Sequence, residues 1–287
     1  WQAMWIEMMV LGWLALELTD SPWWVQVIGF YRSIPLLLIG LFGSAITDRF
    51  KRRHLVLTLQ AANVVAALSL ALLLWSGNLK FWHLSVVALA MGSTWALDWP
   101  TRRSMIPDLV GKAQTVDAMV LENFIQGFTR ISGPLAAGYI MAVYGNLGAL
   151  IILVGLGLLS LLSLSGLKTD SQAPIKSVGI RATWTEMRQG WVYIRESAPI
   201  LGVFLITIFV NVWAFPYMNL LPVFARDIFG QGPEGMGWLG AANGVGAFIG
   251  LGVIHLGRRK LSNEWLFISG SLVSSIGVVF FCVKWNL

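Results

Sequence analysis

Four charged residues lie inside apolar stretches of this 287-residue chain, where they could bind a proton or pair with one another: Glu7, Arg32, Glu122 and Arg130. A charge in the middle of a membrane span costs about 2.5–3.5 kcal/mol or more, so it is seldom kept without a partner or a purpose. Counted from Asp20, Glu7 lies 13 residues before and Arg32 lies 12 residues after. This matched depth predicts an ion pair between antiparallel neighbours. The pair could handle a proton or substrate, or only lock two helices.

Glu122 and Arg130 are eight residues apart, which corresponds to about 80° around a helix. They could therefore share one broad face with two amides, Asn123 and Gln126, which we treat as candidates for lining a substrate cavity. Glu122 is a second candidate for proton coupling. The alternative is a carboxylate that water reaches from the neighbouring loop.

Composition restricts the class of protein. Hydrophobic residues make up 56% of the chain and charged residues 12%, about half the charged fraction of a soluble domain, which indicates a membrane protein. Cys282 is the single cysteine, and three histidines, His54, His83 and His255, are far apart. The chain also lacks HExxH, GxSxG and Walker-type sequences, so we expect no metal site, no cofactor and no enzyme activity.

Apolar stretches long enough to cross a bilayer follow one another along the chain. Nine spans are expected, at about 1–18, 23–47, 54–75, 81–97, 116–144, 147–167, 199–223, 237–256 and 265–284. Between the fourth and fifth spans, polar and proline-marked residues 98–107 are expected to form a loop. The sequence thus predicts an all-α, multi-pass membrane protein.

The longest polar segment, residues 168–198, is expected to link two halves of the protein. Within it, Trp184, Met187, Trp191 and Ile194 recur at helical spacing. Charged residues occupy the other faces, which is typical of an amphipathic helix lying at a membrane surface.

The distribution of Lys and Arg predicts which side of the membrane each loop faces. Of the 20 cations, fifteen fall in the loops that join even to odd spans or in the linker, and these segments are expected in the cytoplasm. Because the cations are topology signals, they do not indicate nucleic acid binding. Tryptophans near the span ends support the same boundaries.

One cationic loop, residues 40–54, occurs twice in similar form. It holds Asp48, Arg49, Lys51, Arg52 and Arg53, and its basic end recurs as Gly257-Arg258-Arg259-Lys260, which is offset by 206 residues. The repeat predicts two six-helix halves, with residues 1–167 as the first and residues 199–287 as the first three helices of the second. Nine of twelve helices would then be present, and three further spans are expected after Leu287.

Several motifs make the chain resemble the major facilitator superfamily, and in particular its bacterial drug, macrolide and siderophore exporters. The family signature G-x-x-x-D-R-x-G-R-R is matched from Ser44 to Arg53, with Ser44 and Lys51 in place of glycines. RISGPLAAG, residues 130–138, resembles the antiporter motif of the fifth span. LDWPTRRSMIPDLV and LLPVFARDIFG also resemble that branch.

The resemblance implies a role for two of these motifs. In the family, the acid and arginines of the cationic loop, here Asp48, Arg49, Arg52 and Arg53, form a conformational switch with the eleventh span. The kink motif, Gly133, Pro134 and Gly138, is associated with contact between spans five and eight. Glycines of the eighth span, Gly240, Gly244, Gly246 and Gly250, would let the two backbones approach, although these glycines can also be plain packing residues.

The seventh span is unusually polar for a helix that faces lipid. Asn211, Tyr217 and Asn219 accompany Pro216 and Pro222, so the helix is expected to be broken and its polar groups to line a cavity between the halves. The alternative is that these amides bond to neighbouring helices.

The resemblance implies a secondary transporter of the bacterial plasma membrane that exports small amphipathic molecules in exchange for protons. It implies alternating access by two rocking bundles, with substrate, protons and lipid as partners, and we expect a monomer. The alternatives are a facilitator or importer of the same fold, or a membrane sensor or scaffold that transports nothing. A channel and an intramembrane enzyme lack supporting motifs.

Overall fold

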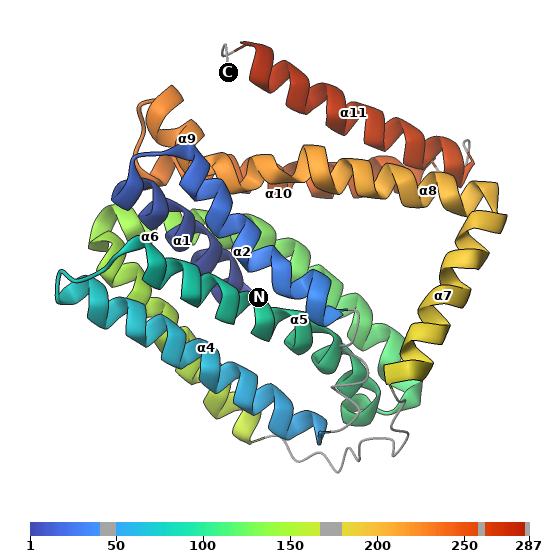
Figure 1. The fold of residues 1–287 in the computed structure, drawn as a ribbon, viewed down its shortest axis with the longest axis horizontal. Coiled ribbons are helices and arrows are strands. Elements are labelled where there is room, and N and C mark those ends of the chain that lie inside the picture. The colour runs from blue at the N-terminus through green and yellow to red at the C-terminus, as the bar shows by residue number, and fades with distance from the viewer. Residues whose placement is uncertain (41–49, 167–179, 258–261, 285–287) are drawn as a thin grey trace.

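The computed structural model describes residues 1–40, 50–166, 180–257 and 262–284 (Figure 1). Within these ranges every regular element is helical, which agrees with the all-α expectation. The elements up to residue 166 are α1 (Gln2–Thr19), α2 (Pro22–Gly40), α4 (Arg52–Trp75), α5 (Phe81–Val110), η1 (Lys112–Gln114) and α6 (Thr115–Ser165). Those from residue 180 are α7 (Ile180–Glu196), α8 (Ala198–Phe209), η2 (Val210–Ala214), η3 (Phe215–Leu220), α9 (Leu221–Val223), η4 (Phe224–Ile228), α10 (Pro233–Gly257) and α11 (Asn263–Lys284).

Helix α1 lies at the centre of the described structure and contacts α2, α5, α6, α9 and α10 (Figure 1). Its buried side chains point in every direction around the helix: Ile6, Met9, Val10, Leu11, Trp13, Leu14, Ala15 and Leu16. A helix that is apolar on all sides is stable when other helices surround it. Packing around α1 therefore positions Glu7 inside the bundle.

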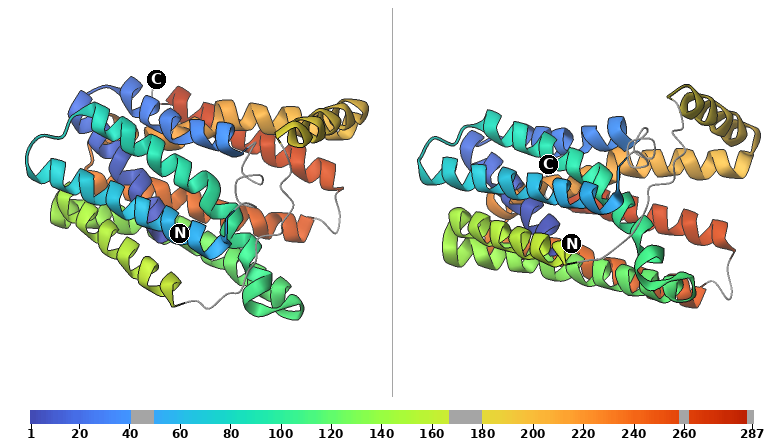
Figure 2. Two further views of the ribbon diagram at one scale, coloured as in Figure 1. Left: turned by 60° about the horizontal axis from the view of Figure 1, so that its bottom comes forward. Right: turned by 90° about the horizontal axis from the view of Figure 1, so that it is seen from below.

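Helix α6 contains two of the expected spans, because the chain turns back at Gly145. This glycine has φ 69° and ψ 179°, a conformation that disfavours residues with a side chain. The returning part of α6 runs beside the first part (Figure 2). The break falls between the fifth and sixth predicted spans.

Helix α5 is longer than the sequence indicated, because the polar segment expected as a loop is helical up to Val110. That expectation was wrong. Pro100 and Pro107 each remove one backbone donor but do not end the helix. Asp98 and Arg102 form an ion pair at i,i+4 spacing, 2.6 Å apart, which stabilises this part of the helix.

The seventh predicted span is irregular, as its prolines and amides indicated. Helix α8 ends at Phe209, π-type hydrogen bonding follows in η2, and a 3₁₀-type segment follows in η3. Before it, α7 corresponds to the predicted amphipathic helix and contacts α8. Helix α10 packs mainly on α6, and α11 contacts η2 and α10.

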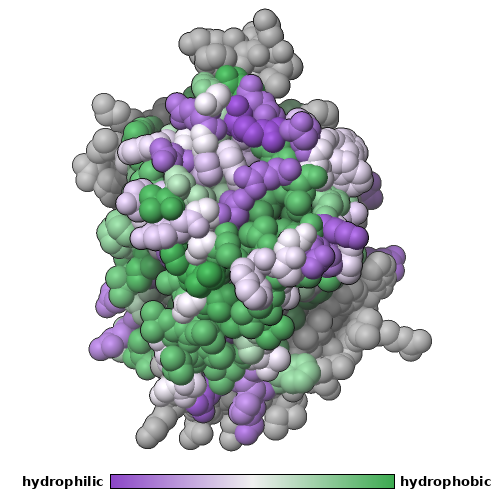
Figure 3. All heavy atoms as spheres, turned by 90° about the vertical axis from the view of Figure 1, so that its left-hand side faces the viewer, coloured by the Kyte–Doolittle hydropathy of each residue, from purple (hydrophilic) through white to green (hydrophobic). Residues whose placement is uncertain are grey.

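Four segments of the described chain are long and apolar enough to cross a membrane: Arg52–Trp75, Lys112–Ser165, Ala198–Ile228 and Pro233–Ile254. The turns near Asp20, residues 76–80 and Gly145 gather at the left end of Figure 1, whereas α7 lies at the right end. Figure 3 faces the left end and shows hydrophilic residues gathered in its upper part above a broad apolar surface. Alternate turns thus lie at one end of the bundle.

Glycines bring α6 and α10 into close contact. A Cβ added to Gly138 would lie 2.6 Å from the Pro233 carbonyl oxygen, and one added to Gly237 would lie 2.8 Å from the Pro134 carbonyl oxygen. A Cβ on Gly244 would lie 2.8 Å from the Arg130 carbonyl oxygen. Pro134 lacks the N–H group that would normally bond to this oxygen. Backbone atoms cannot easily move, so these positions require glycine.

A Gly244→Ala substitution is expected to destabilise the protein by about 1–3 kcal/mol, because the added methyl group overpacks the α6–α10 contact. A matched control is Gly246→Ala on the same helix, where an added Cβ meets nothing within 4 Å. The thermal unfolding midpoint in detergent should fall for the first variant and stay level or rise for the second. Equal midpoints for the two variants would contradict the packing role.

Candidate functional site

The structure brings Glu7 of α1 and Arg32 of α2 together within the bundle. Arg32 Nε donates to Glu7 Oε1 at 3.3 Å. The Glu7 side chain is only 12% exposed and the Arg32 side chain 16%. The Arg32 guanidinium also lies over the Trp95 ring, 5.6 Å from its centroid. The matched depth deduced from the sequence therefore corresponds to a contact.

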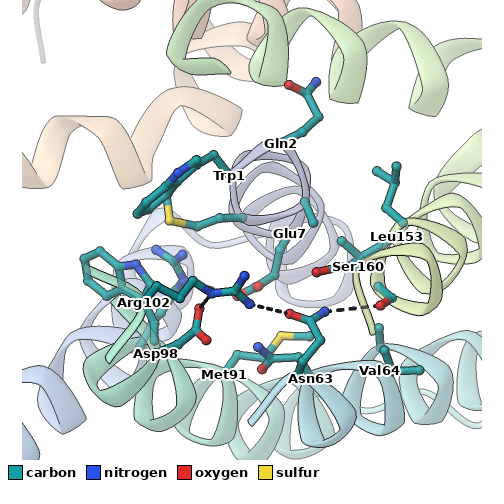
Figure 4. A pocket seen from close by; sticks show the side chains of 18 residues that line it. Trp1, Gln2, Glu7, Asn63, Val64, Met91, Asp98, Arg102, Leu153 and Ser160 are labelled. Carbon is teal, nitrogen blue, oxygen red and sulfur yellow. Dashed lines mark hydrogen bonds and ion pairs between the residues drawn. The ribbon is translucent and has the colours of Figure 1, made fainter. Parts of the chain in front are cut away.

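A second ion pair, Asp98 with Arg102, faces the same interior space from α5 (Figure 4). Arg102 Nη2 also donates to Gln60 Oε1 of α4 at 3.1 Å, and Gln60 Nε2 donates to the Gly157 carbonyl oxygen at 3.4 Å. Sequence reasoning missed this pair because it placed both residues in a loop. Their i,i+4 spacing was the signal that could have identified it.

Both pairs line a cavity of about 290 Å³. Its described walls come from α1, α2, α4, α5 and the returning part of α6, and the lining residues that the structure describes lie within residues 1–160. The polar side chains on its walls include Gln60, Asn63 and Ser160. Asn63 accepts a hydrogen bond from Thr94 at 2.5 Å.

Glu122 and Arg130, which were expected to share one face, bind to different partners. Glu122 Oε2 lies 3.2 Å from Arg103 Nε, and the same arginine donates to Asn123 Oδ1 at 2.8 Å. Gln126 donates to the other Glu122 oxygen at 3.3 Å. These four residues form a polar cluster between α5 and α6 and do not include Arg130.

Arg130 is directed across the α6–α10 contact. Its Nε and Nη2 atoms donate to Asn243 Oδ1 at 3.2 Å and 3.0 Å, and the Asn243 amide nitrogen donates to the Tyr217 hydroxyl. The guanidinium thus connects α6 with α10 and η3. Sequence reasoning had placed Tyr217 in a cavity, and it missed Asn243 because a single amide in an apolar span has no distinctive pattern.

The other two candidates of the seventh span lie apart from Tyr217. Asn211 is exposed and donates to the Thr207 carbonyl oxygen in the preceding turn at 2.8 Å. Asn219 packs against Gly29 of α2 and lines a small cavity of about 20 Å³. The described structure does not bring the three candidates together.

The cationic loop is only partly visible, because Asp48 and Arg49 lie outside the described residues. Arg52 lies 3.1 Å from Asp108 and donates to the Ser104 carbonyl oxygen at 2.8 Å, which joins α4 to α5. Arg53 donates to the Ser165 carbonyl oxygen at 2.6 Å. Both arginines therefore tie together helix ends within the first half.

At the opposite end of the bundle, Arg226 joins the two parts of the chain. Its Nη2 atom lies 2.6 Å from Asp20 Oδ1, in the turn between α1 and α2, and its Nε atom lies 2.6 Å from Asp227 Oδ1. Asp20 and Arg226 are 206 residues apart, the same offset that relates Arg52 to Arg258. The pair therefore connects equivalent positions of the predicted repeat.

Comparison of the sequence with known protein families and proteins confirms the resemblance to the major facilitator superfamily. A family model described as a transmembrane secretion effector of the major facilitator type matches residues 2–286. The staphyloferrin A transporter of Staphylococcus aureus is 30% identical over 141 residues, which are 49% of this chain and 36% of that protein. The uncharacterized MFS-type transporter YfiS of Bacillus subtilis is 22% identical over 269 residues, 92% of this chain and 63% of that protein. In both matches the chain spans less than two thirds of the relative.

An Asn243→Leu substitution is expected to destabilise the fold by about 1–3 kcal/mol, because it leaves the Arg130 guanidinium without its acceptor inside the bundle. Asn243→Asp should be at least as stable as the parent, since a carboxylate would face the same cation. Asn211→Leu is the control, because that amide is exposed and bonds only within its own helix in the described structure. Thermal unfolding in detergent measures all three. Equal losses for Asn243→Leu and Asn211→Leu would refute the bridging role of Asn243.

Proposed function

Because the chain belongs to the transmembrane secretion effector family of the major facilitator superfamily, we propose that it is a secondary transporter that exports small amphipathic molecules in exchange for protons. Transport would take place in the plasma membrane of a bacterium, with the linker and the even-to-odd loops in the cytoplasm. The cation distribution and the grouping of alternate turns at one end of the bundle support this orientation.

The main support for alternating access is the kind of contact that joins the two parts of the chain. Polar side chains connect them at two depths: Arg130 with Asn243 and Tyr217 within the bundle, and Arg226 with Asp20 at the end opposite α7. Side-chain hydrogen bonds between membrane helices contribute only about 0.6 kcal/mol each on average. Such contacts can break and form again during a transport cycle, with the linker keeping the two parts together.

Glu7 is the first candidate for the proton site. Its carboxylate is enclosed within the bundle and is paired with a cation that can also rest on the Trp95 ring. Protonation of Glu7 would release Arg32, so one proton would change two contacts between helices. Glu122 is the second candidate, with Arg103 in the corresponding role.

The substrate class is inferred from a relative. The staphyloferrin A transporter matches half of this chain, which favours a siderophore-like or drug-like molecule with both polar and apolar groups. Arg130 and Tyr217 lie at the α6–α10 contact. They would be free to contact such a molecule when the first half of the chain separates from α10 and η3. Asn123, Gln126, Asn211 and Asn219 are further contacts to test.

Transport by purified protein in liposomes tests this proposal directly. The protein is expressed from its complete coding sequence, and uptake of a siderophore or a fluorescent amphipathic drug is followed with and without an imposed pH gradient. Gradient-driven accumulation supports a proton-coupled exporter. Flux in the opposite direction would indicate an importer, flux without dependence on pH would indicate a facilitator, and absence of flux would indicate a sensor or scaffold.

A Glu7→Gln substitution is expected to abolish pH-gradient-driven accumulation, because the amide cannot take up or release a proton. Exchange of labelled for unlabelled substrate at equal concentrations should continue, since it needs no net proton movement. Glu122→Gln is tested in the same way. The variant that loses more of the pH-gradient-driven accumulation identifies the carboxylate that couples transport to protons. Unchanged gradient dependence in Glu7→Gln would exclude Glu7 as the coupling site.

Covalent closure of the Asp20–Arg226 contact is expected to stop transport, because the two parts of the chain could no longer separate at that end. Asp20→Cys and Arg226→Cys are combined in a background without other cysteines and joined with a cleavable bifunctional thiol reagent. Transport should return when the link is reduced. Each single-cysteine variant serves as a control, and full transport by the linked protein would rule out opening at this end.

A further inference from the structure

The cavity between the two ion pairs is enclosed by the first half of the chain. Its walls come from α1, α2, α4, α5 and the returning part of α6, and none of the described side chains of α7 to α11 lines it. Opening between the two parts of the chain is therefore not needed to form it. The cavity is separate from the α6–α10 contact at Arg130.

Two buried polar atoms of wall residues lack a hydrogen-bond partner within the described structure: Asp98 Oδ1, an acceptor, and Trp95 Nε1, a donor. Buried groups of this kind are usually satisfied by protein or by ordered water. A cavity of about 290 Å³ holds several water molecules, given about 30 Å³ for each in the liquid. The volume of the cavity and its polar walls therefore suit a cluster of water molecules.

The side chains of the ion pairs become less exposed from one end of the cavity to the other. Arg102 is 30% exposed, Asp98 20% and Glu7 12%. Arg102 lies toward the end of α5 at Val110, the end at which α4 begins and α6 finishes. With the proposed orientation, this is the cytoplasmic end. The cavity therefore leads inward from the cytoplasmic side and reaches Glu7.

Together with Glu7, the charged side chains of the cavity sum to zero. Arg32 comes from α2, and Asp98 and Arg102 come from α5. Helices α4 and α6 contribute only uncharged polar groups, among them Asn63 and Ser160. Without a net charge, the space has no built-in attraction for an ionic substrate. Water bound to these groups can conduct protons.

We propose that this cavity is a water-filled route by which Glu7 releases its proton to the cytoplasm, separate from the path of the substrate. The inference rests on the proposed proton-coupled transport. The Glu7 carboxylic acid gives its proton to a cavity water, which becomes a hydronium ion, and the remaining carboxylate accepts the hydrogen bond from Arg32. The proton then passes from water to water along Asp98 to the cytoplasm.

The test fills the cavity without touching its polar groups. Ala67 is a buried wall residue of α4, so Ala67→Leu would displace water, whereas Ala62→Leu adds the same atoms to an exposed position on the same helix. Accumulation driven by a pH gradient should fall by about tenfold or more in Ala67→Leu, since a positioned proton transfer contributes about a hundredfold or more. Substrate exchange should stay within about twofold of the parent, and Ala62→Leu should resemble the parent in both assays.

The outcomes separate this inference from the proposed function. If the parent shows neither accumulation nor exchange, the proposed transport itself fails. If the parent shows both and Ala67→Leu equals it, or loses accumulation and exchange to the same extent, the separate proton route is wrong. Should Ala67→Leu not yield folded protein, Leu156→Phe, at a half-buried apolar wall position of α6, is judged by the same criteria.

Chemical labelling tests the presence of water directly. Ser160→Cys is placed in a background without other cysteines, and a small charged thiol reagent is added from the cytoplasmic side. Labelling is expected, and excess substrate should not protect the thiol. Val65→Cys, at an exposed apolar position on α4, should not react with the charged reagent. No labelling at position 160, or protection by substrate, would overturn the proposal.

Discussion

Charge compensation inside the bundle is the constraint on which the rest of the structure depends. Glu7 faces Arg32, Asp98 faces Arg102, and Glu122 faces Arg103, so each of these three acids has a cation beside it. Removing one partner of a buried pair is costly because the other charge stays behind. The two pairs that join different helices, Glu7 with Arg32 and Glu122 with Arg103, therefore fix the register of those helices, and protonation of either acid would weaken its contact.

The contacts of α6 with its neighbours are of two kinds, and they differ in how they can change. Where Gly138 and Gly237 meet, two backbones touch, so small displacements meet steric resistance. Where Arg130 reaches Asn243, the contact consists of directional hydrogen bonds that can be exchanged for bonds to water or to a ligand. The glycine contact is thus suited to act as a pivot, and the polar contact is suited to open.

Much of the fold follows from local sequence signals. Apolar runs located the helices, the turn at Gly145 falls between the fifth and sixth predicted spans, and the similar separations of Glu7 and Arg32 from Asp20 matched an ion pair that the structure shows. The polar stretch after Leu97 was misjudged because its prolines and charges resemble a loop, whereas the Asp98–Arg102 pair and the packing of α5 keep it helical. The partner of Arg130 could not be foreseen, since Asn243 is 113 residues away and only tertiary packing brings it near.

The ion pair between Asp20 and Arg226 also carries information about the ancestry of the chain. The two residues are 206 positions apart, the offset of the repeat that the sequence predicts. Two identical copies of one unit would place the same residue at both positions, and like charges would then repel across the axis that relates the copies. Opposite charges can arise there only after the copies have diverged. In the predicted repeat, the contact is therefore made by residues of opposite charge at corresponding positions, which distinguishes the two halves from each other.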